Sequence, residues 1–352
     1  MWQSNPLTER LNLKYPIILA PMGTITTPSL AAAVSNTGGL GGIGMWGLTA
    51  DEAARGIAGF RQLSPGSLNV NYPLWPEPRY STEVSEAMRR HLQTSYDARG
   101  LGAVPQARGM ASDVSPEHVA MLLEQKPEVV SFHFGLPAQE VVEAIKSAGI
   151  FILSSATTVA EARMLERHGV DAIIAQGTEA GGHRATFTGV DIGMQVGLFS
   201  LLPQVVDAVG VPVIAAGGIA DGRTAAAAFV LGASAVQLGT AFMRCEEANI
   251  FDAHRAALTQ ADDSCTLVTD LISGRPARYI RNKLVDDLVA SGLKPLPIPA
   301  QLSLTYPLGA AGDRDFAVLF SGQSAALAKD THAAELVERL VEETGRRLRA
   351  FA

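Results

Sequence analysis

Short, continuously apolar segments recur along this chain, and they constrain its fold more than any other feature. Strands buried on both faces of a parallel sheet appear as unbroken apolar runs, whereas half-exposed strands alternate with polar residues. Helix-like stretches lie between many of the runs, among them 49–60, where Thr49 and Glu52 form a capping-box pattern. The runs are "IILAPM" (17–22), "GGLGGIG" (38–44), "SLNVNY" (67–72), "VVSFHF" (129–134), "FILSSA" (151–156), "AIIAQG" (172–177), "PVIAAGG" (212–218) and "AVQLGT" (235–240).

Eight strands alternating with helices predict an α/β fold, a (β/α)8 TIM barrel, in preference to an open doubly wound sheet. Residues 1–245 would form this barrel. The Pro-rich start of 73–112 marks a helical insertion after the third strand. Residues 246–352 would form a smaller helical capping subdomain and the helix that closes the barrel, because they end in the amphipathic segment "AAELVERLVEETGRRLRA".

Composition excludes several classes of function. The net charge is −7 and no basic run stands out, so nucleic acid is not expected as a partner. No secretory signal pattern or apolar stretch of ~20 residues is found, which predicts a cytoplasmic protein without a membrane partner. Two cysteines and the lack of an H-E-x-x-H pattern predict neither a disulfide framework nor a metal site.

The ends of the predicted strands carry the candidate functional residues. In (β/α)8 barrels the catalytic groups lie at the C-terminal ends of the strands, so residues far apart in the sequence meet at one mouth. A histidine, His183, follows the sixth strand closely, directly after Gly181 and Gly182. The strand-end residues are Met22, Gly44, Asn71, His133, Ser155, Gln176, Gly217 and Thr240.

Two glycine-containing turns predict a phosphate site. Gly217 and Gly218 precede one helix, and Gly239 and Thr240 precede the next. Bare backbone N–H groups at such helix starts bind anions, and barrels often hold phosphate after strands seven and eight. The alternative is that these glycines serve only tight turns.

Three uncharged amides indicate that the ligand is more than a phosphate. Asn71, Gln176 and Gln237 both donate and accept hydrogen bonds, which suits a heterocycle with mixed edges. The "APM" segment at 20–22 adds backbone and a thioether beside a flat ring. Flavin mononucleotide (FMN) fits this set, although periodicity alone does not select flavin over another phosphorylated ligand.

The motifs at these positions resemble one family. "APM", "NVN", "SFHFGLP", "QGTEAGGHRA", "AAGGIADG" and "QLGTAF" are similar to those of nitronate monooxygenase, formerly 2-nitropropane dioxygenase, of the bacterial class I type. The resemblance covers about residues 14–245 and continues more weakly through "SGRPARYIRN" and "FSGQSAAL". It implies oxidation of alkyl nitronates, such as propionate 3-nitronate, or of nitroalkanes, by O2 to a carbonyl compound and nitrite.

The resemblance also implies roles for individual residues. His183 would be the active-site histidine over the flavin and His133 a second polar group in the pocket. Gly181 and Gly182 would let the backbone approach the flavin. Pro21, Met22 and Gly23 would lie beside the isoalloxazine ring. FMN would be held by Asn71, Gln176, Gly181, Gly182, Gly217, Gly218, Gln237, Leu238, Gly239 and Thr240.

Alternatives remain open at this point. The same barrel superfamily includes NAD(P)H-dependent quinone and enoyl reductases, and a barrel that binds a phosphorylated ligand without redox chemistry is a third possibility. His133, on an apolar strand, could be a structural hydrogen-bonding residue. Ala185 stands where relatives often have glycine, and Tyr306 is the candidate for a tyrosine of the capping region. The oligomeric state does not follow from the sequence.

Overall fold

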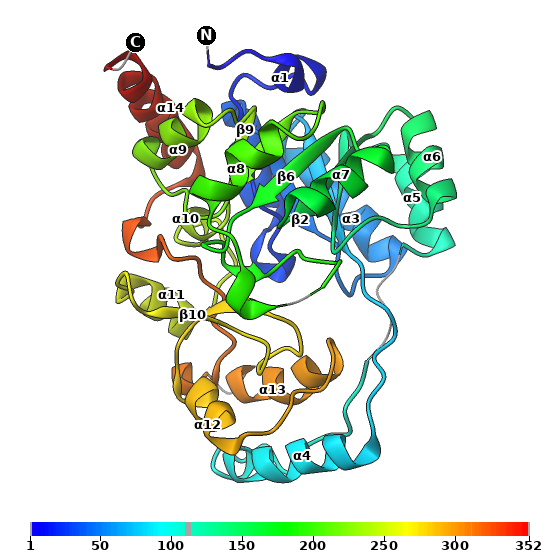
Figure 1. Ribbon diagram of the computed structural model, residues 1–352, viewed down its shortest axis with the longest axis vertical. Helices are drawn as coiled ribbons and strands as arrows, with labels where there is room; N and C mark the ends of the chain where they lie inside the picture. The colour runs from blue at the N-terminus through cyan, green and yellow to red at the C-terminus, as the bar shows by residue number, and fades with distance from the viewer. Residues whose placement is uncertain (1, 110–113, 190, 311, 351–352) are drawn as a thin grey trace.

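Eight parallel strands form a closed barrel in the computed structural model, which describes residues 2–109, 114–189, 191–310 and 312–350. The barrel occupies the upper half of the view in Figure 1. The strand order is β1-β9-β8-β6-β5-β4-β3-β2, and a parallel bridge between Ile18 and Leu40 closes the ring. All eight predicted runs are barrel strands. These are β1 (Ile17–Leu19), β2 (Gly41–Gly44), β3 (Leu68–Pro73), β4 (Val129–His133), β5 (Phe151–Ala156), β6 (Ala172–Gln176), β8 (Val213–Ala216) and β9 (Ala235–Leu238).

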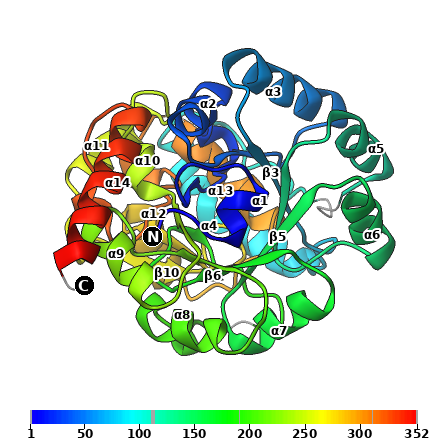
Figure 2. The same cartoon turned by 90° about the horizontal axis from the view of Figure 1, so that it is seen from above.

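Helices surround the barrel, as Figure 2 shows from above. The predicted capping box of Thr49 and Glu52 begins α3, and the last helix, α14, packs against α9 and α2 and so completes the ring. The (β/α)8 prediction is confirmed. The outer helices are α2 (Pro28–Thr37), α3 (Ala50–Leu63), α5 (Pro116–Gln125), α6 (Gln139–Ser147), α7 (Val159–Arg167), α8 (Leu198–Val206), α9 (Gly222–Val230) and α14 (Ala333–Ala350).

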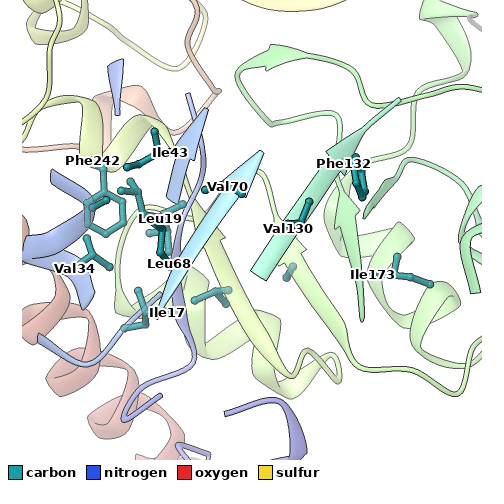
Figure 3. Close-up of a cluster of buried hydrophobic side chains, with 14 of the residues drawn as sticks. Ile17, Leu19, Val34, Ile43, Leu68, Val70, Val130, Phe132, Ile173 and Phe242 are labelled. Carbon is teal, nitrogen blue, oxygen red and sulfur yellow. The ribbon is translucent and has the colours of Figure 1, made fainter. Parts of the chain in front are cut away.

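Two hydrophobic layers hold the barrel together. The outer layer lies between strands and helices, and Figure 3 shows part of it, including Leu19, Val70 and Phe132. The inner layer fills the barrel. Leu7 of α1 (Pro6–Arg10) and Leu11, which directly follows this helix, pack there with Ile18. The N-terminal end of the barrel is therefore sealed, and the C-terminal end is left for a ligand.

A cap covers the C-terminal end of the barrel. One apolar cluster joins Met88, Leu92 and Tyr96 of α4, from the insertion after β3, to Leu288 and Leu308 of the C-terminal region. Figure 1 shows α4 beside α12 and α13 accordingly; residues 110–112 of the insertion lie outside the described ranges. The elements here are α4 (Thr82–Asp97), α10 (Thr240–Met243), α11 (Asp252–Thr259), β10 (Thr266–Thr269), β11 (Ala277–Ile280), α12 (Lys283–Ser291) and α13 (Ala300–Ala310).

The C-terminal region is less purely helical than the sequence predicted, because β10 and β11 form an antiparallel pair. A third strand, β7 (Gly182–His183), joins this small sheet, and His183 pairs with Ala277. The sequence did not predict this strand at His183. The difference arises because a two-residue strand has no periodicity of its own and forms only against its distant partner.

The helices of the described part of the chain include none long and apolar enough to cross a membrane.

The remaining ordered turns are short 3-10 helices. The 3-10 turns are η1 (Gly23–Ile25), η2 (Ile192–Met194), η3 (Arg314–Phe316) and η4 (Ala325–Leu327).

Candidate active site

A cavity of about 680 Å3 lies between the C-terminal ends of the barrel strands and the cap. Alternation along each strand decides what the barrel contributes. On β3, Val70 points outward to the helices, so Asn71 points inward; on β4, Phe132 points outward and His133 inward. The barrel residues that line the cavity by this rule are Ala20, Gly44, Asn71, Pro73, Ser131, His133, Ser155, Ile174, Gln176, Ala216 and Gln237.

Nearly all the predicted site residues meet at this cavity. The exception is Leu238, which is 1% exposed, packs in the outer hydrophobic layer and does not line the cavity. Its side chain points away because it follows the inward-facing Gln237 on β9. The predicted residues that do line the cavity are Pro21, Met22, Gly23, Asn71, His133, Gln176, Gly181, Gly182, His183, Gly217, Gly218, Gln237, Gly239 and Thr240.

Among the described residues that line the cavity, one buried polar side-chain atom has no hydrogen-bond partner. The Oε1 atom of Gln237 is buried and accepts no hydrogen bond from the described residues. A buried amide oxygen in that state costs free energy until a donor reaches it. Nearby, Asn71 donates from Nδ2 to Ser131 Oγ at 2.9 Å. The barrel wall thus presents amide groups suited to the edge of a heterocycle.

Gln176 also hydrogen-bonds to the backbone around His183, a role that the sequence did not reveal. Its Nε2 donates to the backbone oxygen of His183 at 3.1 Å, and its Oε1 accepts from the backbone N–H of Ala185 at 2.9 Å. The Nε2 atom of His133 lies 3.2 Å from the same His183 oxygen, and Ser155 Oγ lies 3.3 Å from Nδ1 of His133. Both side chains therefore fix the backbone that carries His183.

Both histidines are neutral at pH 7. Burial lowers the pKa of His183 to about 3, and electrostatic interactions with His133 and Arg275 act in the same direction. Burial lowers the pKa of His133 to about 4, although the hydrogen bond to the His183 oxygen opposes that shift. Removal of the rings from water disfavours the charged form.

Two glycines of the predicted site are required by geometry. A Cβ on Gly181 would lie 2.5 Å from the backbone nitrogen of Gly322, so the bare backbone admits a segment of the cap. Gly218 has φ +71°, a conformation that side chains with a Cβ rarely adopt. Close approach of the cap is thus a reason for Gly181 in addition to the predicted approach of a flavin.

The cap segment 320–324 closes over the two glycine turns. Gly322 donates its N–H to Thr240 Oγ1 at 2.9 Å, and Ser324 Oγ donates to the backbone oxygen of Gly218 at 2.9 Å. The first turn of α9 is already capped by the carboxylate of Asp221. Because Asp221 already accepts hydrogen bonds from the first N–H groups of α9, an anion at these turns would bind the loop backbone around Gly218 and Gly239.

The outer wall of the cavity is apolar and aromatic. Trp75, Phe134 and Ile298 form a small cluster, and the Arg275 guanidinium lies 4.0 Å from the centre of the Phe134 ring. Phe134 has φ +73°, which is uncommon for a bulky residue and costs ~1–3 kcal/mol unless its surroundings impose it. These neighbours hold it there, directly after His133.

The chain after His183 is anchored by two buried charges. Arg184 is fully buried and donates to the backbone oxygen of Gln176 at 2.8 Å. Glu161 of α7 is also fully buried, and its carboxylate accepts from Thr157, Thr186 and Phe187. Burial opposes ionisation of Glu161, but these hydrogen bonds outweigh burial and its pKa is lowered.

Sequence reasoning missed the contribution of the cap. His254 lines the cavity and is 2% exposed, but nothing in the sequence singled it out. Ser273 and Tyr279 reach His183 through hydrogen bonds and were not singled out either. The segments "SGRPARYIRN" and "FSGQSAAL", noted only as weaker parts of the resemblance, were the available signal.

A capped (β/α)8 barrel with amides, neutral histidines and glycine turns at its mouth has the architecture of a barrel enzyme, whose active site lies at the C-terminal ends of the strands. The family model described as nitronate monooxygenase matches residues 4–343. Curated proteins named nitronate monooxygenase are similar: one from Paraburkholderia phytofirmans is 40% identical, covering 98% of this chain and 97% of its own. One from Pseudomonas aeruginosa is 41% identical, covering 96% and 98%.

Solved structures agree. The nitroalkane oxidase of Streptomyces ansochromogenes superposes with a TM-score of 0.91 at 37% identity, covering 99% of this chain and 100% of its own. FabK from Thermotoga maritima superposes with a TM-score of 0.78 at 30% identity, covering 99% of each chain. The chain belongs to the nitronate monooxygenase family, whose members are flavin-dependent oxidoreductases.

Proposed function

We propose that this protein uses FMN to oxidise alkyl nitronates, such as propionate 3-nitronate, with O2 to a carbonyl compound and nitrite. The observation that carries the proposal is the unpartnered, buried Oε1 of Gln237 in a cavity that also has a glycine turn at Gly218. An N–H on the edge of a flavin ring would satisfy that oxygen. Backbone N–H groups near Gly218 and Gly239 would hold the single phosphate of FMN.

When bound, the flavin supplies the electron-transfer chemistry, and the chain binds and orients the reactants. Gln237 and Asn71 would hold the ring edge, with Pro21 and Met22 beside the ring. The apolar wall around Trp75 and Phe134 would exclude water from the reacting carbon. A nitronate needs no proton removed, so its oxidation does not depend on proton transfer to His183, whose pKa is low.

Anaerobic mixing tests the proposal against reduction by a nicotinamide. The purified protein should carry FMN, identified by mass after release, and its flavin absorbance should change rapidly when propionate 3-nitronate is added alone. After oxygen is admitted, nitrite should form. If NADH bleaches the flavin fully at a comparable rate and the nitronate does not, the protein is a reductase and the proposal is wrong.

A further inference from the structure

The ring of His183 is held by a pair of buried residues from the cap. Its Nε2 atom lies 2.9 Å from Ser273 Oγ. Tyr279 donates its hydroxyl to the same Ser273 oxygen at 2.8 Å, and Ser273 Oγ lies 3.0 Å from the backbone oxygen of Arg275. Ser273 and Tyr279 are both 0% exposed, so water does not compete for these contacts.

Counting protons in this group fixes the direction of each bond. A serine hydroxyl has one hydrogen and two lone pairs. The carbonyl of Arg275 only accepts, so Ser273 gives it the hydrogen. Tyr279 fills one lone pair of Ser273, and the remaining lone pair faces His183. All three contacts are satisfied together when the neutral ring carries its proton on Nε2.

We propose that Ser273 and Tyr279 are positioning residues that keep His183 protonated on Nε2, so that Nδ1 is the atom that accepts a proton from a neutral nitroalkane. No described residue hydrogen-bonds to Nδ1, and the ring lines the cavity. In this step the C–H bond beside the nitro group breaks and the proton moves to Nδ1. The electron pair passes into the nitro group, which leaves a nitronate and an imidazolium.

The fold reinforces this arrangement. In the small sheet, His183 pairs with Ala277, and Tyr279 lies two residues further along the same strand, so both side chains belong to one face. The Tyr279 ring stacks on Phe320 with centroids 4.8 Å apart. His254 lies 2.9 Å, through Nε2, from the backbone oxygen of Phe320. The orientation of Ser273 is therefore set by the cap.

The proposal rests on the proposed function for the identity of its substrate. It predicts different effects for the neutral nitroalkane and for the anionic nitronate. A lone pair on Nδ1 accepts a proton from a neutral nitroalkane, but it does not attract the anionic oxygens of a nitronate. Loss of the Ser273 contact should therefore affect proton removal and leave oxidation of a pre-formed nitronate nearly unchanged.

The tautomer can be read directly by 15N NMR on the purified, flavin-loaded protein labelled at histidine nitrogens, without substrate. Loss of one signal set in a His183→Asn sample assigns the resonances of His183. We expect the wild type at pH 7 to show a protonated Nε2 and a bare Nδ1. In Ser273→Ala both tautomers should be populated, and Tyr279→Phe should shift the populations less, in the same direction.

Activity on paired substrates completes the test. In Ser273→Ala, kcat/KM for nitroethane should fall about tenfold, the scale of one lost hydrogen bond, while that for ethyl nitronate changes less than about twofold. Thr305→Val is the matched control. It removes another buried cap hydroxyl, bonded to the backbone oxygen of Ile272 at 2.7 Å, without touching His183. It should alter neither the tautomer nor the ratio between the two substrates.

Several results would overturn the proposal. A wild-type ring protonated on Nδ1, or charged at pH 7, would refute the assignment even if nitronates are oxidised. Equal losses on both substrates in Ser273→Ala would make its role purely structural. If Ser273→Ala does not fold, an unshifted tautomer and substrate ratio in Tyr279→Phe would reject the role of the pair. Absence of nitronate turnover, with the Nε2 tautomer intact, would instead count against the proposed function.

Discussion

The barrel wall and the cap wall of the cavity differ in how their side chains are placed. On the barrel wall, alternation along each parallel strand turns residues such as Asn71 and Gln237 inward, so one rule serves every strand. On the cap wall, Ser273, Tyr279 and Phe320 come from a hairpin and a loop with no shared rule. His183 belongs to both, since it follows barrel strand β6 and pairs with cap strand β11.

This difference indicates that the two walls have different roles in the site. The barrel wall offers neutral amides and glycine turns, which suit a cofactor that stays in place. The cap wall sets the orientation of the ring that meets the substrate. We therefore expect changes on the barrel wall to remove the cofactor, and changes on the cap wall to alter which substrate is processed.

The largest effect should come from Gly218→Val on the barrel wall. A β-branched residue cannot adopt φ +71° without strain, and it would displace the loop backbone that we expect to bind phosphate. FMN content after purification should fall more than about tenfold, and all flavin-dependent activity with it. Gly292→Val is the control, because Gly292 has φ +64° at the end of α12, with nothing within 4 Å of its Cβ position. Full flavin content in Gly218→Val would place the phosphate elsewhere.

His183→Asn should have the next largest effect, and it tests the residue at which the two walls meet. A positioned general base contributes ~10²–10⁴-fold, so activity on neutral nitroalkanes should fall by that order. Activity on the pre-formed nitronate should fall much less, and FMN should be retained. Steady-state rates with nitroethane and ethyl nitronate measure the split. Equal losses on both would assign His183 to anion binding, and no loss on either would exclude it from the chemistry.

The same contrast explains what the sequence could predict. Asn71, Gln176 and Gln237 were predictable because they lie at or near the ends of apolar runs. Leu238 does not line the cavity, because its strand alternates and its side chain points to the outer layer. Ser273 and Tyr279 were not predictable, since their partner His183 lies about 90 residues away and β7 exists only through that pairing. His254 was not predictable either, because its place at the cavity depends on how the cap packs onto the barrel.

Glu161→Gln should give a smaller effect, on stability. The Glu161 carboxylate fixes Thr186 and Phe187, which follow β7, and loss of charge-assisted hydrogen bonds there should cost about 1–3 kcal/mol of unfolding free energy at pH 7. The folded-state pKa of Glu161 is lowered, so this stabilisation is present above its unfolded pKa, near 4.5, and is lost as pH falls through the folded value.

The gap in melting temperature between wild type and Glu161→Gln should therefore narrow below about pH 4.5. Thermal unfolding at several pH values measures it. Glu140→Gln, at an exposed position of α6, should show no comparable pH dependence. A gap that stays constant down to pH 3 would mean that the Glu161 charge does not hold this segment.

The smallest effect should come from Arg108→Ala on the cap side. Among the described residues that line the cavity, Arg108 is the one lysine or arginine, and its side chain is exposed. Propionate 3-nitronate carries a carboxylate that this cation could attract, whereas ethyl nitronate carries none. An exposed ion pair contributes only ~0.2–1 kcal/mol and is screened by salt, so kcat/KM for propionate 3-nitronate should fall about two- to fivefold at low ionic strength. The loss should vanish near 1 M salt, and turnover of ethyl nitronate should be unaffected throughout.

Arg79→Ala is the matched control. It removes an exposed cation at the neighbouring cavity and should leave kcat/KM for both substrates unchanged. A salt-independent loss on both substrates would show that Arg108 shapes the cavity by packing, and the cap would then select substrates by shape without a contribution from this charge.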